Sequence, residues 1–159
     1  MSIVVRNAKK EDMKSVLALI KELAAFEKEP HAVEVTETDL QRDGFGSHPA
    51  FHCFVAEMNS EIVGIALTYM RYSTWKGPVL HLEDIVVSQA KRGHGIGTLL
   101  LNAVVKQGSE LGVKRICWEV LDWNEPAIKF YEQKGANVMR DWDVVQMDEA
   151  AIQTYMSKI

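Results

Sequence analysis

Three strand-like segments that follow one another between residues 50 and 87 constrain the fold of this chain most strongly. The run FHCFVAEM is followed by the short turn NS and by EIVGIALTYMRYS, and TWKGP then leads into a third run, VLHLEDIVV. Each run is rich in β-branched and aromatic residues, and the connections have the spacing of hairpins. We therefore expect an antiparallel meander whose apolar side is covered by helices.

Helical patterns flank these strands. The run SIVVRNA predicts a first strand, and the apolar residues of 13–24 then recur on one face of a helix that should end near Pro30. The segment TETDLQRDGFG predicts a short second helix, in which Thr36 and Asp39 form a loose capping box. A third helix is predicted over residues 95–111, which carry apolar residues along one side.

The last third of the chain alternates between strand and helix patterns. VKRICWEVL predicts a strand, NEPAIKFYEQKG a helix with Asn124 as its N-cap, NVMRDWDVVQMDE a final pair of short strands and EAAIQTYMSKI a short helix. The chain has 159 residues and no internal repeat or shift in composition, so we expect one domain over residues 1–159. A mixed α/β sheet with helices on both faces is the natural packing.

The composition excludes several kinds of partner. Acidic residues outnumber basic ones by 22 to 18, which gives a formal net charge of -4, whereas a nucleic-acid-binding face needs an excess of cations. The sequence has no apolar leader and no run near the roughly 20 apolar residues that span a bilayer, so a soluble, cytoplasmic protein without a membrane partner is expected.

Cys53 and Cys117 lie in apolar runs that are typical of buried thiols. The five histidines lack metal-ligand spacing, and no metal site is expected.

The segment KRGHGIGTLL, which begins at Lys91, carries three glycines at alternate positions behind two cations. Gly93, Gly95 and Gly97 allow the backbone to approach an anion closely, and the first turn of the following helix offers unpaired N–H groups. The segment therefore predicts a phosphate-binding loop, with a simple strand-to-helix turn as the alternative. A dinucleotide fingerprint would need a glycine in place of Thr98, and a P-loop would need a lysine after the last glycine, so neither nucleotide motif fits.

The pattern R-x-x-G-x-G from Arg92 to Gly97, placed after a meander, resembles the pyrophosphate loop of the GNAT N-acetyltransferase superfamily. The order of elements resembles that fold as well. Within the superfamily, IKELAAFEK, STWKG, LEDIVV, RGHGIGT and LDWNEPAIKFYEQKGA are similar to the diamine acetyltransferases, and AFEK, STWKG and LDWN look most like their thialysine branch. The similarity extends from Ile3 to about Met147. It implies a sheet that splays between its fourth and fifth strands, acetyl-CoA as cosubstrate, and a homodimer.

The resemblance also implies a direct transfer of the acetyl group from the thioester to a primary amine. This reaction needs a neutral amine, a stabilised oxyanion and a proton for the leaving thiolate. Glu83 is implied to handle the amine proton, directly or through water, and Tyr131 to be the general acid for the sulfur. On a regular strand Glu83 would share a face with His81 and Ile85, and Asp84 would lie on the other face, unless a bulge relaxes the alternation.

The other residues that the resemblance implies fall into two groups. Those implied to bind acetyl-CoA are Ile85, Val86, Val87, Arg92, Gly93, His94, Gly95, Ile96, Gly97, Thr98, Asn124, Glu125, Pro126 and Ala127. Those implied to bind the amine are Phe26, Glu27, Glu83, Asp84, Cys117, Trp118 and Glu119. The stretch after QKGA is shorter than the acidic stretch of the family, which favours a short amine over a long polyamine.

Other interpretations of the same residues stay open. A protein or peptide N-acetyltransferase would need an open groove, a non-catalytic acyl-CoA-binding module would bind CoA without turnover, and a Rossmann-type protein would bind NAD. On the residues alone, Glu83 could be a solvent-facing carboxylate and Tyr131 a core aromatic.

Overall fold

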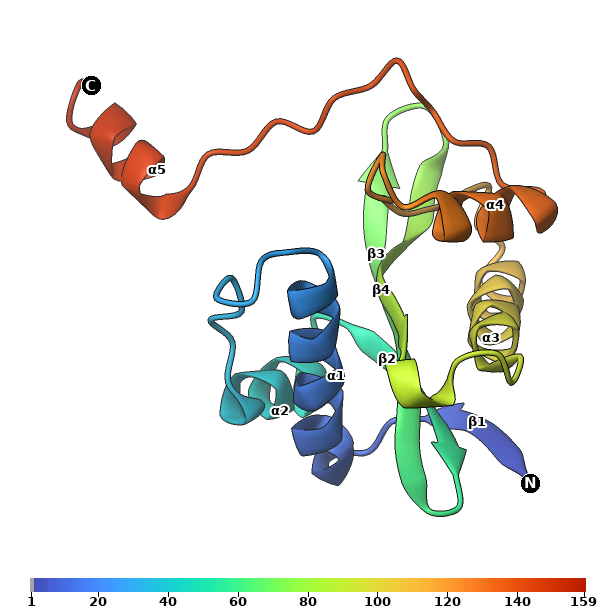
Figure 1. The fold of residues 1–159 in the computed structure, drawn as a ribbon. Helices are drawn as coiled ribbons and strands as arrows, with labels where there is room; N and C mark the ends of the chain where they lie inside the picture. The colour runs from blue at the N-terminus through green and yellow to red at the C-terminus, as the bar shows by residue number, and fades with distance from the viewer. Residues whose placement is uncertain (1) are drawn as a thin grey trace. The chain divides into compact units, whose positions relative to one another are not determined.

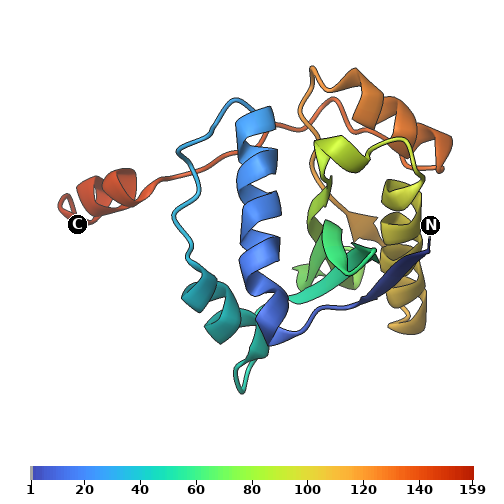
Figure 2. The same ribbon diagram turned by 60° about the horizontal axis from the view of Figure 1, so that its bottom comes forward.

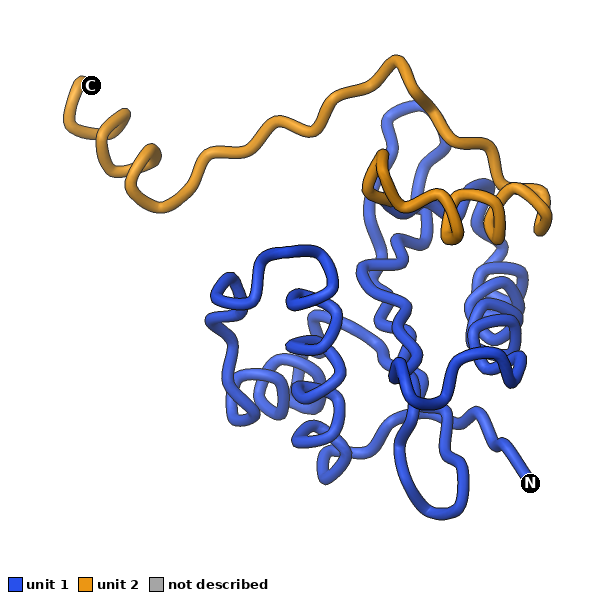
Figure 3. The backbone as a smooth tube through the Cα atoms, in the orientation of Figure 1, with its two compact units in different colours: residues 1–119 blue, residues 120–159 orange. Residues whose placement is uncertain are grey.

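The computed structural model describes residues 2–159. It consists of two compact units, residues 1–119 and residues 120–159 (Figure 3). The first unit holds the β-sheet with α1, α2 and α3, and the second holds α4 and α5.

The sheet of the first unit has five strands. In spatial order they are β1 (Ile3–Asn7), β2 (His52–Met58), β3 (Glu61–Ser73), β4 (Gly77–Val87) and β5 (Ile116–Cys117). The first four are antiparallel to their neighbours, and β5 runs parallel to β4, so the predicted meander and the mixed sheet are confirmed. At the turn between β2 and β3, Asn59 and Ser60 have φ angles of 52° and 63°, as two-residue hairpins require.

Helices cover both faces of this sheet (Figure 1). On one face lie α1 (Met13–Phe26), which follows the 3₁₀ turn η1 (Lys10–Asp12), and α2 (Glu37–Phe45); on the other face lies α3 (Ile96–Glu110). The apolar core under α1 consists of Met13, Val16, Leu19, Leu40, Cys53, Val55, Ile65 and Val86. Under α3, Gly64 leaves room for the helix, because a Cβ there would lie 3.0 Å from Cδ1 of Leu100.

Local signals set the ends of the helices in the first unit. The predicted capping box of α2 is confirmed, since the Thr36 side chain accepts from the Asp39 N–H and Asp39 accepts from the Thr36 N–H at 2.9 Å. The first helix ends at Phe26, earlier than the predicted stop near Pro30. The reason lies at Lys28, whose φ of 66° is left-handed and cannot continue a helix.

The second unit contains α4 (Glu125–Gln133) and α5 (Glu149–Met156). Asn124 caps α4 as predicted, accepting a hydrogen bond from the Ala127 N–H at 3.4 Å. The predicted pair of strands over residues 137–149 is wrong, because within residues 2–159 no strand pairs with this segment. Val144 and Val145 suit a strand, but a strand also needs a neighbour with which to form backbone hydrogen bonds.

Candidate active site

The parallel pair of strands separates early. β5 is paired with β4 only at two positions, Leu80 with Ile116 and His81 with Cys117, whereas β4 continues to Val87. The predicted strand over residues 113–121 is therefore reduced to two residues, and the predicted separation of the fourth and fifth strands is confirmed. Beyond His81, this edge of β4 has no strand partner in the described part of the chain, so an extended ligand could pair with it.

A β-bulge interrupts β4 at Glu83. Thr68 lies opposite Leu82 and Leu67 lies opposite Asp84, which leaves Glu83 as the extra residue. Its side chain is 53% exposed, in contrast to the buried Leu82 before it. The bulge therefore turns a carboxylate outward in the middle of a mostly buried strand.

The bulge also changes which residues share a face. Tyr69 lies opposite His81, and Leu67, two residues earlier on the regular β3, lies opposite Asp84, so His81 and Asp84 are on the same face. Oε2 of Glu83 lies 3.3 Å from Nε2 of His81, which brings Glu83 to that face too. The alternation expected of a regular strand therefore does not hold for Glu83 and Asp84, and the bulge considered from the sequence is the reason.

Three carboxylates form what we call the acidic face, Glu27, Glu83 and Asp84. Burial first, and then the charges of Glu83 and Glu27, together raise the pKa of Asp84 to about 6. Partial burial also raises the pKa of Glu27. The pKa of Tyr69 is raised by burial, and then by the charge of Glu83 and a hydrogen bond to it. Both charged neighbours that act on Asp84 are negative, so the acidic face favours a bound cation.

Replacing Asp84 with asparagine is expected to stabilise the fold at pH 7. The pKa of Asp84 is about 6 in the folded chain and 3.8 ordinarily, so the folded state holds this proton more strongly and the free energy of unfolding falls as the pH rises through that interval. At about 1.4 kcal/mol per pKa unit, the Asp84→Asn variant gains up to about 3 kcal/mol in urea unfolding at pH 7. At pH 3, below both pKa values, the two proteins should be almost equally stable, and a gain of the same size at both pH values would contradict this explanation.

His81 lies between Cys117 and the acidic face and contacts both. Its Sγ lies 3.5 Å from Nδ1 of His81, and the His81 ring centre lies 5.0 Å from that of Tyr69. The sequence placed Cys117 among the amine-binding residues but left out His81 and Tyr69, although the alternation along LHLED already put His81 beside the acid. Trp118 is half-buried and Glu119 is exposed in the segment after β5.

The glycine loop leads from β4 to α3 through the 3₁₀ turn η2 (Gln89–Lys91). Gly93 and Gly95 have φ angles of 82° and 75°, and an added Cβ at either would meet nothing within 4 Å. The Leu99 N–H donates to the Gly95 carbonyl at 3.1 Å and is the first donor of the helix, so the N–H groups of residues 96–98 have no acceptor in the preceding turn. An open backbone and these N–H groups suit a bound phosphate group.

Arg92 ties the glycine loop to the end of α1. Its Nε donates to the Val87 carbonyl at 3.2 Å, and its guanidinium carbon lies 5.2 Å from the centre of the Phe26 ring, a cation–π contact. The Gln89 N–H donates to the Glu22 carboxylate at 2.6 Å. Figure 2 shows η2 and the loop running between the end of α1 and the start of α3. Phe26 therefore lies beside the loop, with 41% of its surface exposed.

Of the remaining predicted site residues, some lie in the first unit and the others in the second. His94 is exposed, with Nδ1 3.0 Å from the Arg92 carbonyl, whereas the Ile96 side chain is buried and leaves only the backbone for a ligand. Residues 124–127 form the start of α4 in the second unit. Tyr131 is buried on the same helix, one turn after Ile128.

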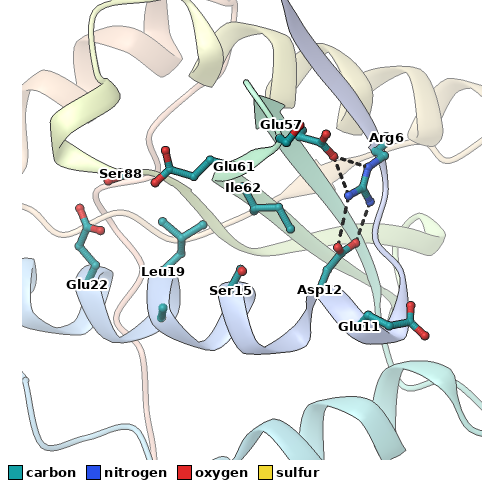
Figure 4. Close-up of a pocket in the computed structure, with 12 residues that line it drawn as sticks. Arg6, Glu11, Asp12, Ser15, Leu19, Glu22, Glu57, Glu61, Ile62 and Ser88 are labelled. Atoms are coloured by element: carbon teal, nitrogen blue, oxygen red, sulfur yellow. Dashed lines mark hydrogen bonds and ion pairs between the residues drawn. The ribbon is translucent and has the colours of Figure 1, made fainter.

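A cavity of about 560 Å³ lies elsewhere in the first unit (Figure 4). Arg6 is held on its wall by ion pairs to Asp12 at 2.7 Å and to Glu57 at 2.8 Å, and the Arg6 guanidinium keeps the pKa of Asp12 below its usual value. None of the described residues that line it is a predicted site residue. The chemistry of the acidic face and the glycine loop, rather than the volume of this cavity, therefore locates the candidate site.

The described residues form neither a metal-binding cluster nor a membrane-spanning helix. Over residues 2–159, no group of three His, Cys, Asp or Glu side chains is placed to hold a metal ion. In the same range, every helix is too short or too polar to cross a bilayer.

Comparison with known proteins places this geometry in a family. The acetyltransferase (GNAT) family matches residues 16–136. The chain belongs to the GNAT family. This GNAT protein is 41% identical over 140 residues to the thialysine N-epsilon-acetyltransferase of Mus musculus, which covers 83% of this chain and 82% of that protein. The family match and this relative show that the chain is an N-acetyltransferase.

Two further similarities extend the GNAT assignment. The chain is 41% identical over 143 residues to the human spermidine/spermine N(1)-acetyltransferase-like protein 1, covering 83% of this chain and 20% of that protein. The structure of AAC(6')-Iy in complex with the bisubstrate analogue CoA-S-monomethyl-acetylneamine superposes with a TM-score of 0.77 at 18% identity, covering 93% of this chain and 99% of that one. This last likeness is one of fold, and it confirms the predicted GNAT architecture.

Proposed function

We propose that this GNAT enzyme transfers the acetyl group of acetyl-CoA to a primary amine of a small cationic molecule, such as thialysine, a polyamine or a related diamine. The observation that carries the proposal is the bulge at Glu83, which gathers carboxylates on one face of β4 where its edge becomes open. The relatives named for thialysine and for spermidine or spermine support the same class of substrate.

Acetyl-CoA is proposed to bind along the glycine loop and the open edge of β4. The backbone of residues 92–98 would hold the pyrophosphate, and that of residues 85–87 would pair with the pantetheine arm as an added strand. Residues 124–127 are proposed to contribute through the family motif at the start of α4. When bound, acetyl-CoA supplies the acetyl group as a thioester.

Glu83 is proposed to accept the proton of the substrate amine. A lysine-like amine has a pKa of about 10.4, so at neutral pH it must lose a proton before it can attack. The exposed Glu83 carboxylate can reach this proton directly or through a water molecule. Asp84 and Glu27 are proposed to attract a second positive charge, beside a hydrophobic wall formed by Phe26.

Tyr131 is proposed to return a proton to the sulfur of CoA. A tyrosine, with an ordinary pKa of about 10, can protonate a thiolate whose thiol has a pKa near 8.5 if the transfer is concerted and water is excluded. The support for this role is the family motif around Tyr131 and its burial on α4.

A matched pair of amines tests the proposed substrate class. Putrescine and butylamine have the same carbon chain, but only putrescine carries a second charge for the acidic face. In thiol-release assays with acetyl-CoA, we expect kcat/KM to be at least about tenfold higher for putrescine, which is the effect of one ion pair worth about 1.4 kcal/mol. Equal values would contradict a role for the acidic face, and turnover of peptides alone would favour a protein N-acetyltransferase.

The variant Gly95→Ala is expected to raise the KM for acetyl-CoA about tenfold and to leave the KM for the amine unchanged. Its left-handed φ of 75° costs a residue with a Cβ about 1–2 kcal/mol, and the methyl group would stand where a phosphate must approach. Gly112→Ala is the matched control, because Gly112 has a φ of 68° and equally open surroundings at the other end of α3. An equal rise in both variants would contradict phosphate binding by the loop.

We also propose that residues 1–159 act as one functional domain, in a cytoplasmic homodimer. The support is the similarity to the diamine acetyltransferases over most of the chain. Light scattering at assay concentrations should give twice the chain mass, and a monomer with full activity would contradict the dimer.

A further inference from the structure

His81 is a buried polar residue to which the proposed reaction assigns no role. Only 6% of its surface is exposed, and its two ring nitrogens lie near different partners. Nε2 lies 3.3 Å from Oε2 of Glu83, and Nδ1 lies 3.5 Å from Sγ of Cys117. Together with Tyr69, these side chains join three neighbouring strands.

The two partners select one form of the neutral imidazole. A neutral histidine has one N–H and one unprotonated ring nitrogen, an ionised carboxylate can only accept, and a thiol can donate. The form with its proton on Nε2 therefore suits both Glu83 and Cys117, whose thiol lies nearer to Nδ1, at 3.5 Å, than to its other acceptor, the Leu80 carbonyl at 3.9 Å. With the proton on Nδ1, a lone pair of the ring would face the Glu83 carboxylate, which is unfavourable.

Glu83 needs such a partner because of the bulge. As the extra residue it has no Cα partner on β3, and its exposed side chain could adopt several rotamers. His81 is fixed by burial and by the Tyr69 ring, so it can hold one orientation of the carboxylate.

We infer that His81 is a positioning residue for Glu83, and that Cys117 selects the ring form of His81 with its proton on Nε2. The inference rests on the proposed function, in which Glu83 accepts the amine proton. The charged and titratable groups around the contact are Tyr69, Cys117, Asp84 and Glu27.

Two amide substitutions at His81 separate positioning from packing. The amide of His81→Gln can occupy the place of Nε2 and donate to Glu83, whereas the shorter amide of His81→Asn replaces Nδ1 and faces Cys117. We expect kcat to fall by about 10- to 100-fold in His81→Asn and in His81→Phe, and to stay within about threefold of the unmodified enzyme in His81→Gln. The KM for acetyl-CoA should stay within about twofold in all three.

The pH profile gives a second readout that packing alone would not move. Without the His81 N–H, the Glu83 carboxylate keeps only the Tyr69 hydroxyl as a donor, so the acid limb of kcat/KM should shift to higher pH in His81→Asn and not in His81→Gln. Equal losses in all three variants, with no shift of the acid limb, would overturn the inference and leave the proposed function intact.

The ring form of His81 can be measured without turnover. In ¹⁵N NMR we expect His81 of the unmodified enzyme to carry its proton on Nε2 and to keep it there in Cys117→Ser. In Cys117→Ala the preference for Nε2 should become weaker, because only Glu83 then favours it. A proton on Nδ1 in the unmodified enzyme would overturn the inference. If the unmodified enzyme acetylates no amine, the proposed function fails, and this spectrum still decides whether His81 donates to Glu83.

Discussion

The variant Tyr131→Phe is expected to lower kcat for acetyl transfer by a factor of about 10² to 10⁴, while the Kd for CoA stays almost unchanged. The substitution removes only the hydroxyl that would protonate the leaving thiolate, and a positioned general acid contributes a factor of this size. The buried ring on α4 keeps its shape, so the helix should stay folded. Steady-state thiol release gives kcat, and calorimetric titration with CoA gives the Kd.

Tyr72→Phe is the matched control for this experiment. Tyr72 lies on β3 with 73% of its surface exposed, and its hydroxyl has no proposed role. Its loss should leave both kcat and the Kd unchanged. If Tyr131→Phe had the kcat of the unmodified enzyme, the general acid would have to be another group. If the unmodified protein were stabilised by CoA and released no thiol, an acyl-CoA-binding module would be the better description.

The variant Glu83→Gln is expected to lower kcat/KM for the amine by a factor of about 10² to 10⁴ at pH 7, and by much less near pH 10. The amide keeps the size of the side chain but cannot accept the amine proton. As the pH approaches the amine pKa of about 10.4, more of the amine is already neutral and the base is needed less. A pH series of thiol release with one amine measures this convergence.

Glu110→Gln provides the control for the loss of a negative charge. Glu110 is 68% exposed on α3, where it pairs with Lys106. We expect its replacement to leave the pH profile unchanged. A loss in Glu83→Gln that stays the same from pH 7 to pH 10 would contradict its role as the proton acceptor and would leave it a role in binding only.

The parts of the fold that depend on neighbouring residues could be predicted from the sequence. The turn at Asn59 and Ser60 and the caps at Thr36 and Asn124 involve residues within a few positions of one another, and all three were predicted correctly. The strands expected over residues 137–149 were wrong because pairing depends on a distant partner, which local β-propensity does not supply.

The arrangement of the acidic face could be predicted only in part. The residues LHLED marked the acids, but the register of β3 against β4 decides that Glu83 bulges and that Asp84 turns to the face of His81. A register shift of one residue exchanges the faces of a strand, and nothing within LHLED specifies it. The contact between His81 and Cys117 depends on the pairing of β4 with β5, and it was missed for the same reason.

The most direct test of the central claim is kcat/KM for thialysine, lysine, putrescine, spermidine and spermine with acetyl-CoA as the donor. We predict thiol release and an N-acetylated product with at least one of these amines, with the higher kcat/KM values for the shorter amines. Thiol release with none of the five would contradict the assignment of this enzyme to small primary amines.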